Sequence, residues 1–562
     1  MTSSTLISST IPFSFLHQSL ALLLSMTAYR FWISARPIRG HVYVACSDRL
    51  LIFSTFALYC SCHDLSWDVF GESIALKLLI YSALGILSLK FVTLAADYGV
   101  ESMCFEKVGV LLLAGMTAIH PPIAFLFLCF YSFARGAVIP LHEGFPFRAL
   151  QLFSVSLPVT KIFLLLGLFE KSGLAPQIPT LSLLFILFGA TYFHPGKCKL
   201  SLGQTRFHWI MRNQLHYLLV NGYLWGWFGH RAPSTVVVQA KILKMLNIPS
   251  AIFVTGSQLL CCTCLFCPYW AVTLLFSVIA FHLMVFITAG LLFWEFTVFN
   301  AMMIAATLNV PVEVSHQLFS IGMGSFAWLV ILKFSGQIWN PPGLGWWDTP
   351  FVQQLQWDLF GSDGQWYSLD CAEMGIWEIQ FVKGPVPARP RHFITGHLGC
   401  SVRLPTMEDR RELVQRLVRT NGEASQLSPL LSQADVRENF PQLQRYLVNR
   451  LQAQARRPKT SAFHKWFRVF WVNGGNYYTG KRYPRYYGQV PISRIRIRYE
   501  EFFFNEEEIK QISDLEVSTF DISHGAPLKL NLSVENSKPV LREQDGSEVH
   551  FTDLSSLSKE LL

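Results

Sequence analysis

Long apolar runs recur along the first 340 residues and limit the chain to folds whose helices lie in lipid or against one another. Hydrophobic residues make up 51% of the 562 residues and charged residues only 15%, whereas soluble domains carry nearer a quarter. In chain order the runs cover about 11–33, 50–62, 74–95, 108–133, 147–169, 181–192, 250–267, 271–294, 296–308 and 317–332. They predict an integral membrane bundle of about eight to ten segments spanning 1–340.

The charge pattern fits a membrane partner better than a nucleic acid. The net charge is +9, but the basic residues lie in loops between apolar runs. Positive-inside placement and lipid headgroups explain such loops. We expect a multi-pass integral membrane protein whose partners are membrane lipid and a lipophilic small molecule. The sequence does not identify which cellular membrane holds it. The CCTCLFC string at 261–267 contains the CxxC spacing of redox or metal sites, yet its apolar setting favours packed thiols, and no metal ligand set is predicted.

The character of the chain changes after Asn340. Alternating patterns predict strands at about 352–360, 365–369, 376–382 and 491–504, with a Gly361-Ser-Asp-Gly turn between the first two. Solvated helices are expected at 407–419 and 434–455. We therefore expect a polar, β-rich α+β domain over 341–545 and a mobile tail over 546–562.

The segment at 203–230 is rich in polar and aromatic residues. On one continuous helix, a single face carries Thr205, Trp209, Arg212, Asn213, His216, Tyr217, Tyr223 and Trp227. No acidic residue occurs between Glu170 and Glu295, so Arg212 has no local carboxylate. Three interpretations stay open: an interfacial amphipathic helix, a cavity wall for an anionic or carbonyl-bearing ligand, and ordinary core.

Three other apolar runs carry polar groups. His282 lies in the middle of one run. It is interpreted either as a functional histidine or as one that is hydrogen bonded to a backbone carbonyl of the next helix. Lys161 is either a base made usable by desolvation or a side chain that snorkels to water; Gln151 lies earlier in the same run. His120-Pro121-Pro122 interrupts another run. This break is interpreted as a simple kink, as a re-entrant pair of helices, or as a discontinuous helix that places His120 at a functional site.

Four segments together resemble the vitamin K-dependent γ-carboxylase-like superfamily, which includes the horizontally transferred transmembrane domain proteins. They are PLHEGFPFRALQLF at 140–153 followed by Lys161, FHLMVFITAG at 281–290, HQLFSIGMGSF at 316–326, and WWDTPFVQQLQWDLFGSDGQWYSL at 346–369. The resemblance implies a reduced isoprenoid quinone as cofactor and Lys161 as the base. Many members are not carboxylases, so the scaffold also suits tailoring or cyclisation of a terpenoid or quinone.

The first hypothesis is therefore a membrane enzyme acting on an isoprenoid or other lipophilic substrate. Its expected catalytic residues are Lys161, His282 and His216. Its expected substrate-binding residues are Arg212, Asn213, Tyr217, Tyr223, Gln151 and His120. The alternative hypothesis is a non-catalytic membrane scaffold or a transporter-like protein.

Overall fold

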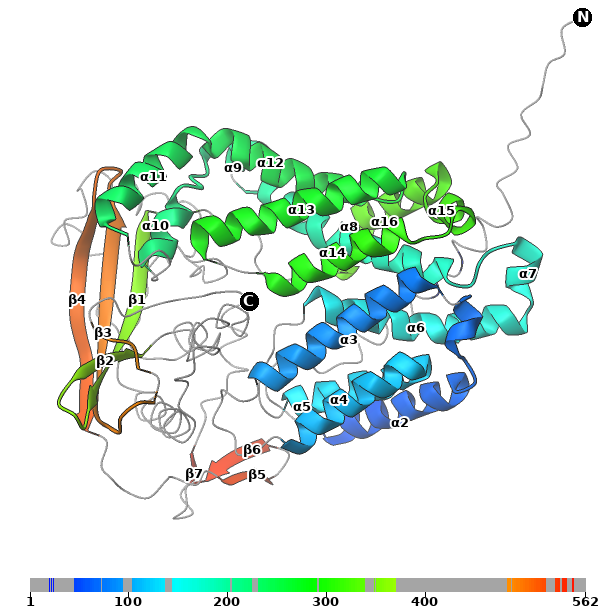
Figure 1. The fold of residues 1–562 in the computed structure, drawn as a ribbon, viewed down its shortest axis with the longest axis horizontal. Coiled ribbons are helices and arrows are strands. Elements are labelled where there is room, and N and C mark those ends of the chain that lie inside the picture. The colour runs from blue at the N-terminus through cyan, green and yellow to red at the C-terminus, as the bar shows by residue number, and fades with distance from the viewer. Residues whose placement is uncertain are drawn as a thin grey trace, which may run out of the picture.

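The structure of the protein, a computed structural model, is mostly helical with a strand-containing region near the C-terminus (Figure 1). It describes residues 45–71, 73–94, 104–136, 144–202, 205–224, 231–290, 293–338, 348, 350–369, 483–486, 488–521, 531–535, 538–542 and 548–549, together with 20, 22 and 24. The expected segments at 376–382, 407–419 and 434–455 lie outside these residues, as do nearly all of the first apolar run and most of the tail.

Eighteen helical segments precede the strands among the described residues. They are α2 (Ala45–Cys62), η1 (Trp67–Phe70), α3 (Ile74–Leu94), α4 (Cys104–Ile119), η3 (Pro121–Ile123), α5 (Ala124–Gly136), α6 (Phe145–Leu165), α7 (Leu168–Ser172), α8 (Ile178–Leu200), α9 (His208–Arg212), α10 (Tyr217–Leu224), α11 (Pro233–Met245), α12 (Asn247–Leu260), η4 (Cys261–Thr263), α13 (Pro268–Ala289), α14 (Trp294–Leu308), α15 (Val312–Leu318) and α16 (Ile321–Ile338). In α2 the side chains are described from Phe53 onward.

Helix α8 is the centre of the bundle and is almost entirely buried. It packs against α6, α12 and α16, while α14 packs against α3 and α13. Prolines stand in the first turns of α6, α8 and α13, where the missing N–H has no helical partner to lose. Gly290 ends α13 with φ of +71°, a left-handed conformation that glycine adopts without strain.

Among the described residues, four helices are long and apolar enough to cross a membrane: α3, α6, α8 and α13. Two bent pairs, α11 with α12 and α14 with α15, would raise the number to six. Other apolar helices, such as the stretch Phe53–Cys62, are shorter. These findings fit a multi-pass membrane protein. The described residues contain four to six helices that could cross a membrane, fewer than the eight to ten membrane segments expected.

The break at His120 forms the turn of a helical hairpin. Helices α4 and α5 lie side by side (Figure 1), and Gly109 of α4 faces the Phe130 ring of α5. Tyr81 and Trp67 both donate hydrogen bonds of 2.8 Å to the carbonyl of Ala118. The chain therefore turns back at His120 and does not continue as one kinked helix.

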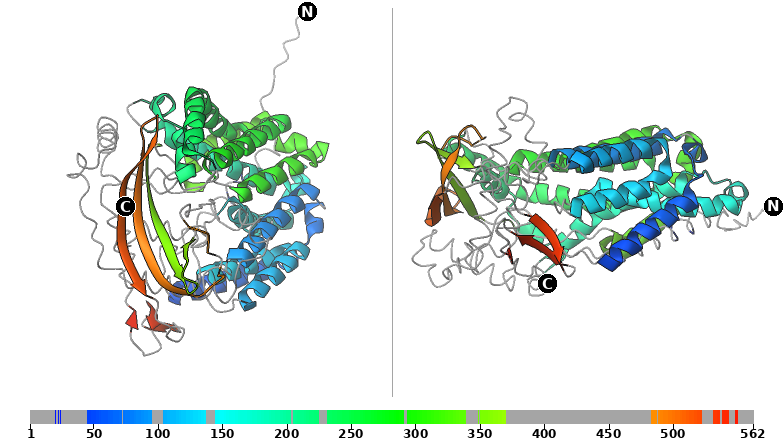
Figure 2. Two further views of the ribbon diagram at one scale, coloured as in Figure 1. Left: turned by 60° about the vertical axis from the view of Figure 1, so that its left-hand side comes forward. Right: turned by 90° about the horizontal axis from the view of Figure 1, so that it is seen from below.

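The C-terminal strands form two antiparallel sheets. The larger has the order β2-β1-β3-β4, built from β1 (Phe351–Gly361), β2 (Trp366–Leu369), β3 (Ile492–Phe504) and β4 (Ile509–Asp521). The smaller contains β5 (Asn531–Glu535), β6 (Lys538–Arg542) and β7 (Glu548–Val549). The strands expected at 352–360, 365–369 and 491–504 are confirmed, and the larger sheet stands at one end of the helical bundle (Figure 2).

Candidate functional site

A buried polar cluster joins three helices of the bundle. Oη of Tyr192 on α8 lies 2.8 Å from Nε2 of His282 on α13, and Nδ2 of Asn300 on α14 donates to the same Oη at 2.6 Å. The exposed fractions of the three residues are 3%, 6% and 0%. Tyr192 therefore links two helices that also pack directly on each other.

The direction of these hydrogen bonds sets the state of the imidazole. Because the amide of Asn300 donates to the tyrosine oxygen, the proton of Tyr192 is left to donate to Nε2 of His282. A neutral imidazole then carries its own proton on Nδ1. Among the described residues, neither this Nδ1–H nor Oδ1 of Asn300 has a hydrogen-bond partner. The cluster thus ends in one unused donor and one unused acceptor, both shielded from water.

Apolar rings surround the histidine. The centroids of Phe281, Phe293 and Phe296 lie 5.1, 5.3 and 5.6 Å from that of His282. An unpaired buried donor costs about 1–3 kcal/mol, so its persistence among aromatic rings indicates a group that binds something else. Nε2 of Gln151, on the neighbouring helix α6, is a second buried donor without a described partner, while its Oε1 accepts from Arg148 at 3.2 Å.

An ion pair positions the start of the helix that carries Asn300. Nζ of Lys90 on α3 lies 2.8 Å from Oε2 of Glu295 in the first turn of α14, and both side chains are buried. The negative charge is favourable at a helix N-terminus. Because breaking a buried pair is far costlier than an exposed one, this pair fixes α14 against α3.

A second polar cluster joins the helices to the larger sheet. Nε2 of His216 lies 3.1 Å from Oε1 of Glu506, which also accepts from Oη of Tyr217 at 2.9 Å. Lys244 approaches the other carboxylate oxygen at 3.2 Å. On the far side of the ring, Nδ2 of Asn247 donates to Nδ1 of His216 at 2.9 Å. Every polar atom of this imidazole therefore has a partner.

Glu506 occupies the turn between β3 and β4 with φ of +77°, a conformation that is strained for a residue with a side chain. Burial alone would raise the pKa of its carboxyl, but hydrogen bonds from His216, Tyr217 and Lys244 outweigh burial and lower the pKa to about 2. Burial, followed by the neighbouring carboxylate, raises the pKa of Tyr217. The turn is thus held to the helices by a carboxylate that is ionised at neutral pH.

The expected single helix over 203–230 is wrong. The chain forms α9 and α10 instead, and Asn213 between them has extended backbone. The side chain of Asn213 donates to Asp348 at 2.7 Å and accepts from the Asp348 N–H at 2.9 Å, and these bonds hold the extended conformation. As a result Arg212 is exposed while Asn213 and Tyr223 are buried, so the expected common face does not exist.

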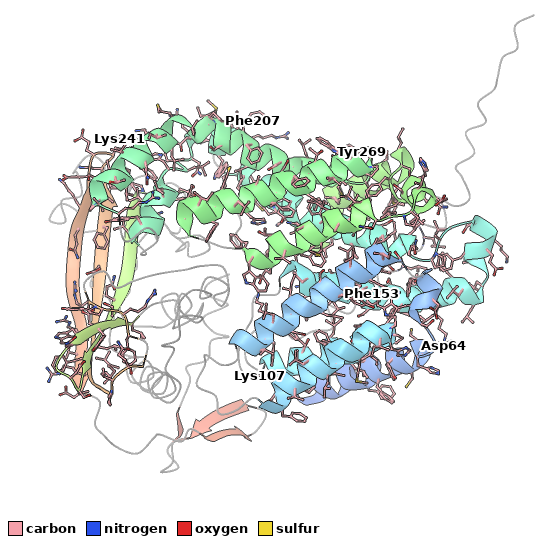
Figure 3. The ribbon with its side chains drawn as sticks, in the orientation of Figure 1. Asp64, Lys107, Phe153, Phe207, Lys241 and Tyr269 are labelled. Atoms are coloured by element: carbon pink, nitrogen blue, oxygen red, sulfur yellow. The ribbon has the colours of Figure 1, made fainter. Side chains whose placement is uncertain are left out.

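The remaining expected site residues lie apart from His282. Nζ of Lys161 pairs with Oδ1 of Asp64 at 2.5 Å, with exposed fractions of 22% and 56%. Asp64 lies at the end of the bundle opposite the sheet (Figure 3). His120 caps η3 at the hairpin turn and is half-buried. The structure therefore groups His216 with Tyr217, and leaves Lys161, His282 and His120 with separate surroundings.

Three of the four thiols of the CCTCLFC string donate hydrogen bonds to backbone carbonyls. Cys261 donates to Ser257, Cys262 to Leu259 and Cys264 to Phe185. Within the described ranges no group of three His, Cys, Asp or Glu side chains is arranged to hold a metal ion. These hydrogen bonds tie the string to the neighbouring backbone.

Sequence reasoning missed the partners of both histidines. Tyr192 ends an apolar run, and Asn300 interrupts another, so a polar group within such a run is the available signal. Glu506 gives no local signal, because it is 290 residues from His216. Comparisons of this chain with protein-family models, curated proteins and solved structures found no match.

Proposed function

We propose that the protein is an integral membrane enzyme that acts on an oxygen-bearing lipophilic substrate at the Tyr192–His282–Asn300 cluster. The observation that carries this proposal is the pair of unused polar atoms on His282 and Asn300, buried between apolar helices. A buried polar group inside a membrane bundle is costly and marks a functional site by default. The eight to ten membrane segments of the bundle belong to the same proposal.

The chemistry follows from the direction of the hydrogen bonds. The Nδ1–H of His282 donates to a carbonyl, carboxyl or hydroxyl oxygen of the substrate, and Asn300 Oδ1 accepts from a hydroxyl. When the imidazole gives up its Nδ1 proton to the substrate, Nε2 takes the proton of Tyr192, so the imidazole stays neutral and the pair acts as a general acid. The negative charge that balances the transferred proton is left on the oxygen of Tyr192, to which the Asn300 amide donates a hydrogen bond. The phenylalanines around the ring suit an isoprenoid or other hydrocarbon chain.

The resemblance to the γ-carboxylase-like superfamily joins this proposal as its second line of support. A quinone or quinol oxygen is one of the groups that the Nδ1–H donor fits, so the residues present are compatible with the reduced isoprenoid quinone which that resemblance implies. Lys161 as the base stays a prediction: its ion pair with Asp64 would have to open before the amine could accept a proton.

The test is an untargeted comparison of lipid extracts from cells with and without the protein, alongside His282→Gln. His63→Gln is the matched control, because His63 is exposed and its hydrogen bond in the described part of the chain goes to the backbone carbonyl of Cys60. We expect a lipid that depends on the protein to be lost in His282→Gln and kept in His63→Gln.

Two other outcomes would redirect the proposal. A lipid lost in Lys161→Ala but retained in His282→Gln would move the chemistry to Lys161. If no lipid changes with the wild-type protein present, the scaffold or transporter-like alternative gains instead.

A further inference from the structure

Helices α9 and α11 present an apolar surface at the edge of the bundle. On α11, Val238, Ile242 and Met245 fall within about 60° of one another around the helix axis, with exposed fractions of 57%, 51% and 75%. Phe207, directly before α9, and Met211 on α9 are 66% and 56% exposed. Both helices pack against α12, and Figure 3 shows Phe207 and Lys241 along the same edge of the molecule. We call these residues, with their neighbouring cations, the α9–α11 face.

The cations of this face are exposed and lack acidic partners. Arg206, Arg212 and Lys241 are all exposed, and no described carboxylate pairs with any of them. Lys244 differs, because it points to Glu506 of the sheet. The acid-free sequence from 171 to 294 supplies no negative charge to this face. Exposed apolar side chains with cations beside them match the boundary between hydrocarbon and anionic headgroups.

The bend between two helices places the face at that boundary. Helix α12 with η4 forms part of a candidate span, and α11 is inclined to it by 64°. If α12 runs close to the membrane normal, α11 lies nearer the membrane plane. The exposed stripe of α11 also continues into Ile248 and Ile252, on the outer side of α12. Exposed apolar side chains therefore occur both on the candidate span and on the helix inclined to it.

We infer that the α9–α11 face binds anionic lipid headgroups in the leaflet nearest the sheet, with its apolar side chains seated among the upper acyl carbons. One lysine or arginine near an anionic membrane surface contributes about a fivefold preference. This inference is independent of the chemistry at His282, since it uses none of the residues of that cluster.

The test uses the full-length protein in vesicles of equal dioleoylphosphatidylserine and dioleoylphosphatidylcholine. Met245 is replaced by photoreactive p-benzoylphenylalanine, and lipid adducts are counted by mass spectrometry. We expect phosphatidylserine adducts to exceed phosphatidylcholine adducts at least about fivefold, because Lys241 and Arg212 lie on the same face. The preference should shrink in 0.5 M salt, since exposed charges are screened.

Two controls separate headgroup binding from general lipid contact. The same photoreactive residue at Phe276, which is 58% exposed in α13, should label both lipids equally, because their acyl chains are identical. Arg212→Gln with Lys241→Gln should bring the Met245 ratio close to one, while Lys171→Gln with Lys333→Gln should leave it unchanged. The inference would be overturned by equal numbers of phosphatidylserine and phosphatidylcholine adducts at position 245 of the otherwise wild-type protein. It would also be overturned if Arg212→Gln with Lys241→Gln left the ratio of the two adducts unchanged, or if position 245 formed protein adducts in place of lipid adducts.

Discussion

Two buried histidines in the described part of the chain, His216 and His282, differ in how completely their rings are hydrogen bonded. His216 uses both ring nitrogens, one toward Glu506 and the other toward Asn247. His282 uses one ring nitrogen toward Tyr192 and leaves the other buried without a described partner. A fully paired ring stabilises the packing of two parts of a chain, whereas a half-paired ring keeps the capacity to bind or to transfer a proton.

The largest expected effect is on catalysis at His282. In the proposed enzyme, His282→Gln removes the proton carrier and should lower product formation about 100- to 10,000-fold, the range typical of general acid–base catalysis. The melting temperature should change little by comparison, because glutamine occupies a similar volume. Product formation is measured per folded molecule, with His63→Gln alongside.

Tyr192→Phe refines the same prediction. Without the tyrosine proton, nothing holds the imidazole proton on Nδ1, so product formation should fall although the ring remains packed. Full activity in both Tyr192→Phe and His282→Gln would remove the distinction between the two histidines and leave His282 as a packing residue.

The second effect is on stability at His216. His216→Ala strips Glu506 and Asn247 of a buried partner, and we expect the free energy of unfolding to fall by about 2–4 kcal/mol. Tyr217→Phe removes one hydrogen bond to the same carboxylate and should cost about 1 kcal/mol. Unfolding is followed in detergent, with product formation measured on the folded fraction. A loss of activity in stable His216→Ala protein would instead return His216 to the catalytic group.

The third effect is a pH dependence that belongs to the sheet contact. The folded pKa of Glu506 is about 2, below its ordinary value of 4.5. The contact therefore stabilises the folded state fully above about pH 4.5, and this stabilisation is lost as the pH falls toward 2. The difference in melting temperature between wild type and Glu506→Gln should shrink over that window. A difference that stays constant from pH 6 to pH 2.5 would show that Glu506 keeps an ordinary pKa.

The helices and the main strands were predictable because their signals are local. Apolar runs located most helices, and strand-like patterns located β1, β2 and β3. The hydrogen-bond partners were not predictable in this way. Asn213 meets Asp348 from 135 residues away and Tyr192 meets His282 from 90, so the broken helix over 203–230 and the buried cluster both depend on tertiary contacts.

The smallest expected effect on stability comes from Lys161. The sequence offered this residue as a catalytic base, and in the structure its amine pairs with Asp64. Its partner Asp64 is more than half exposed, and exposed ion pairs contribute about 0–1 kcal/mol. Lys161→Met should therefore lower the free energy of unfolding by less than about 1 kcal/mol, because the methionine keeps the apolar stem in place. If Lys161 is only an anchor, Asp64→Asn and Lys161→Met should have equal effects on stability and none on product formation. If it is the base, Lys161→Met should abolish product formation while Asp64→Asn, which frees the amine, retains it.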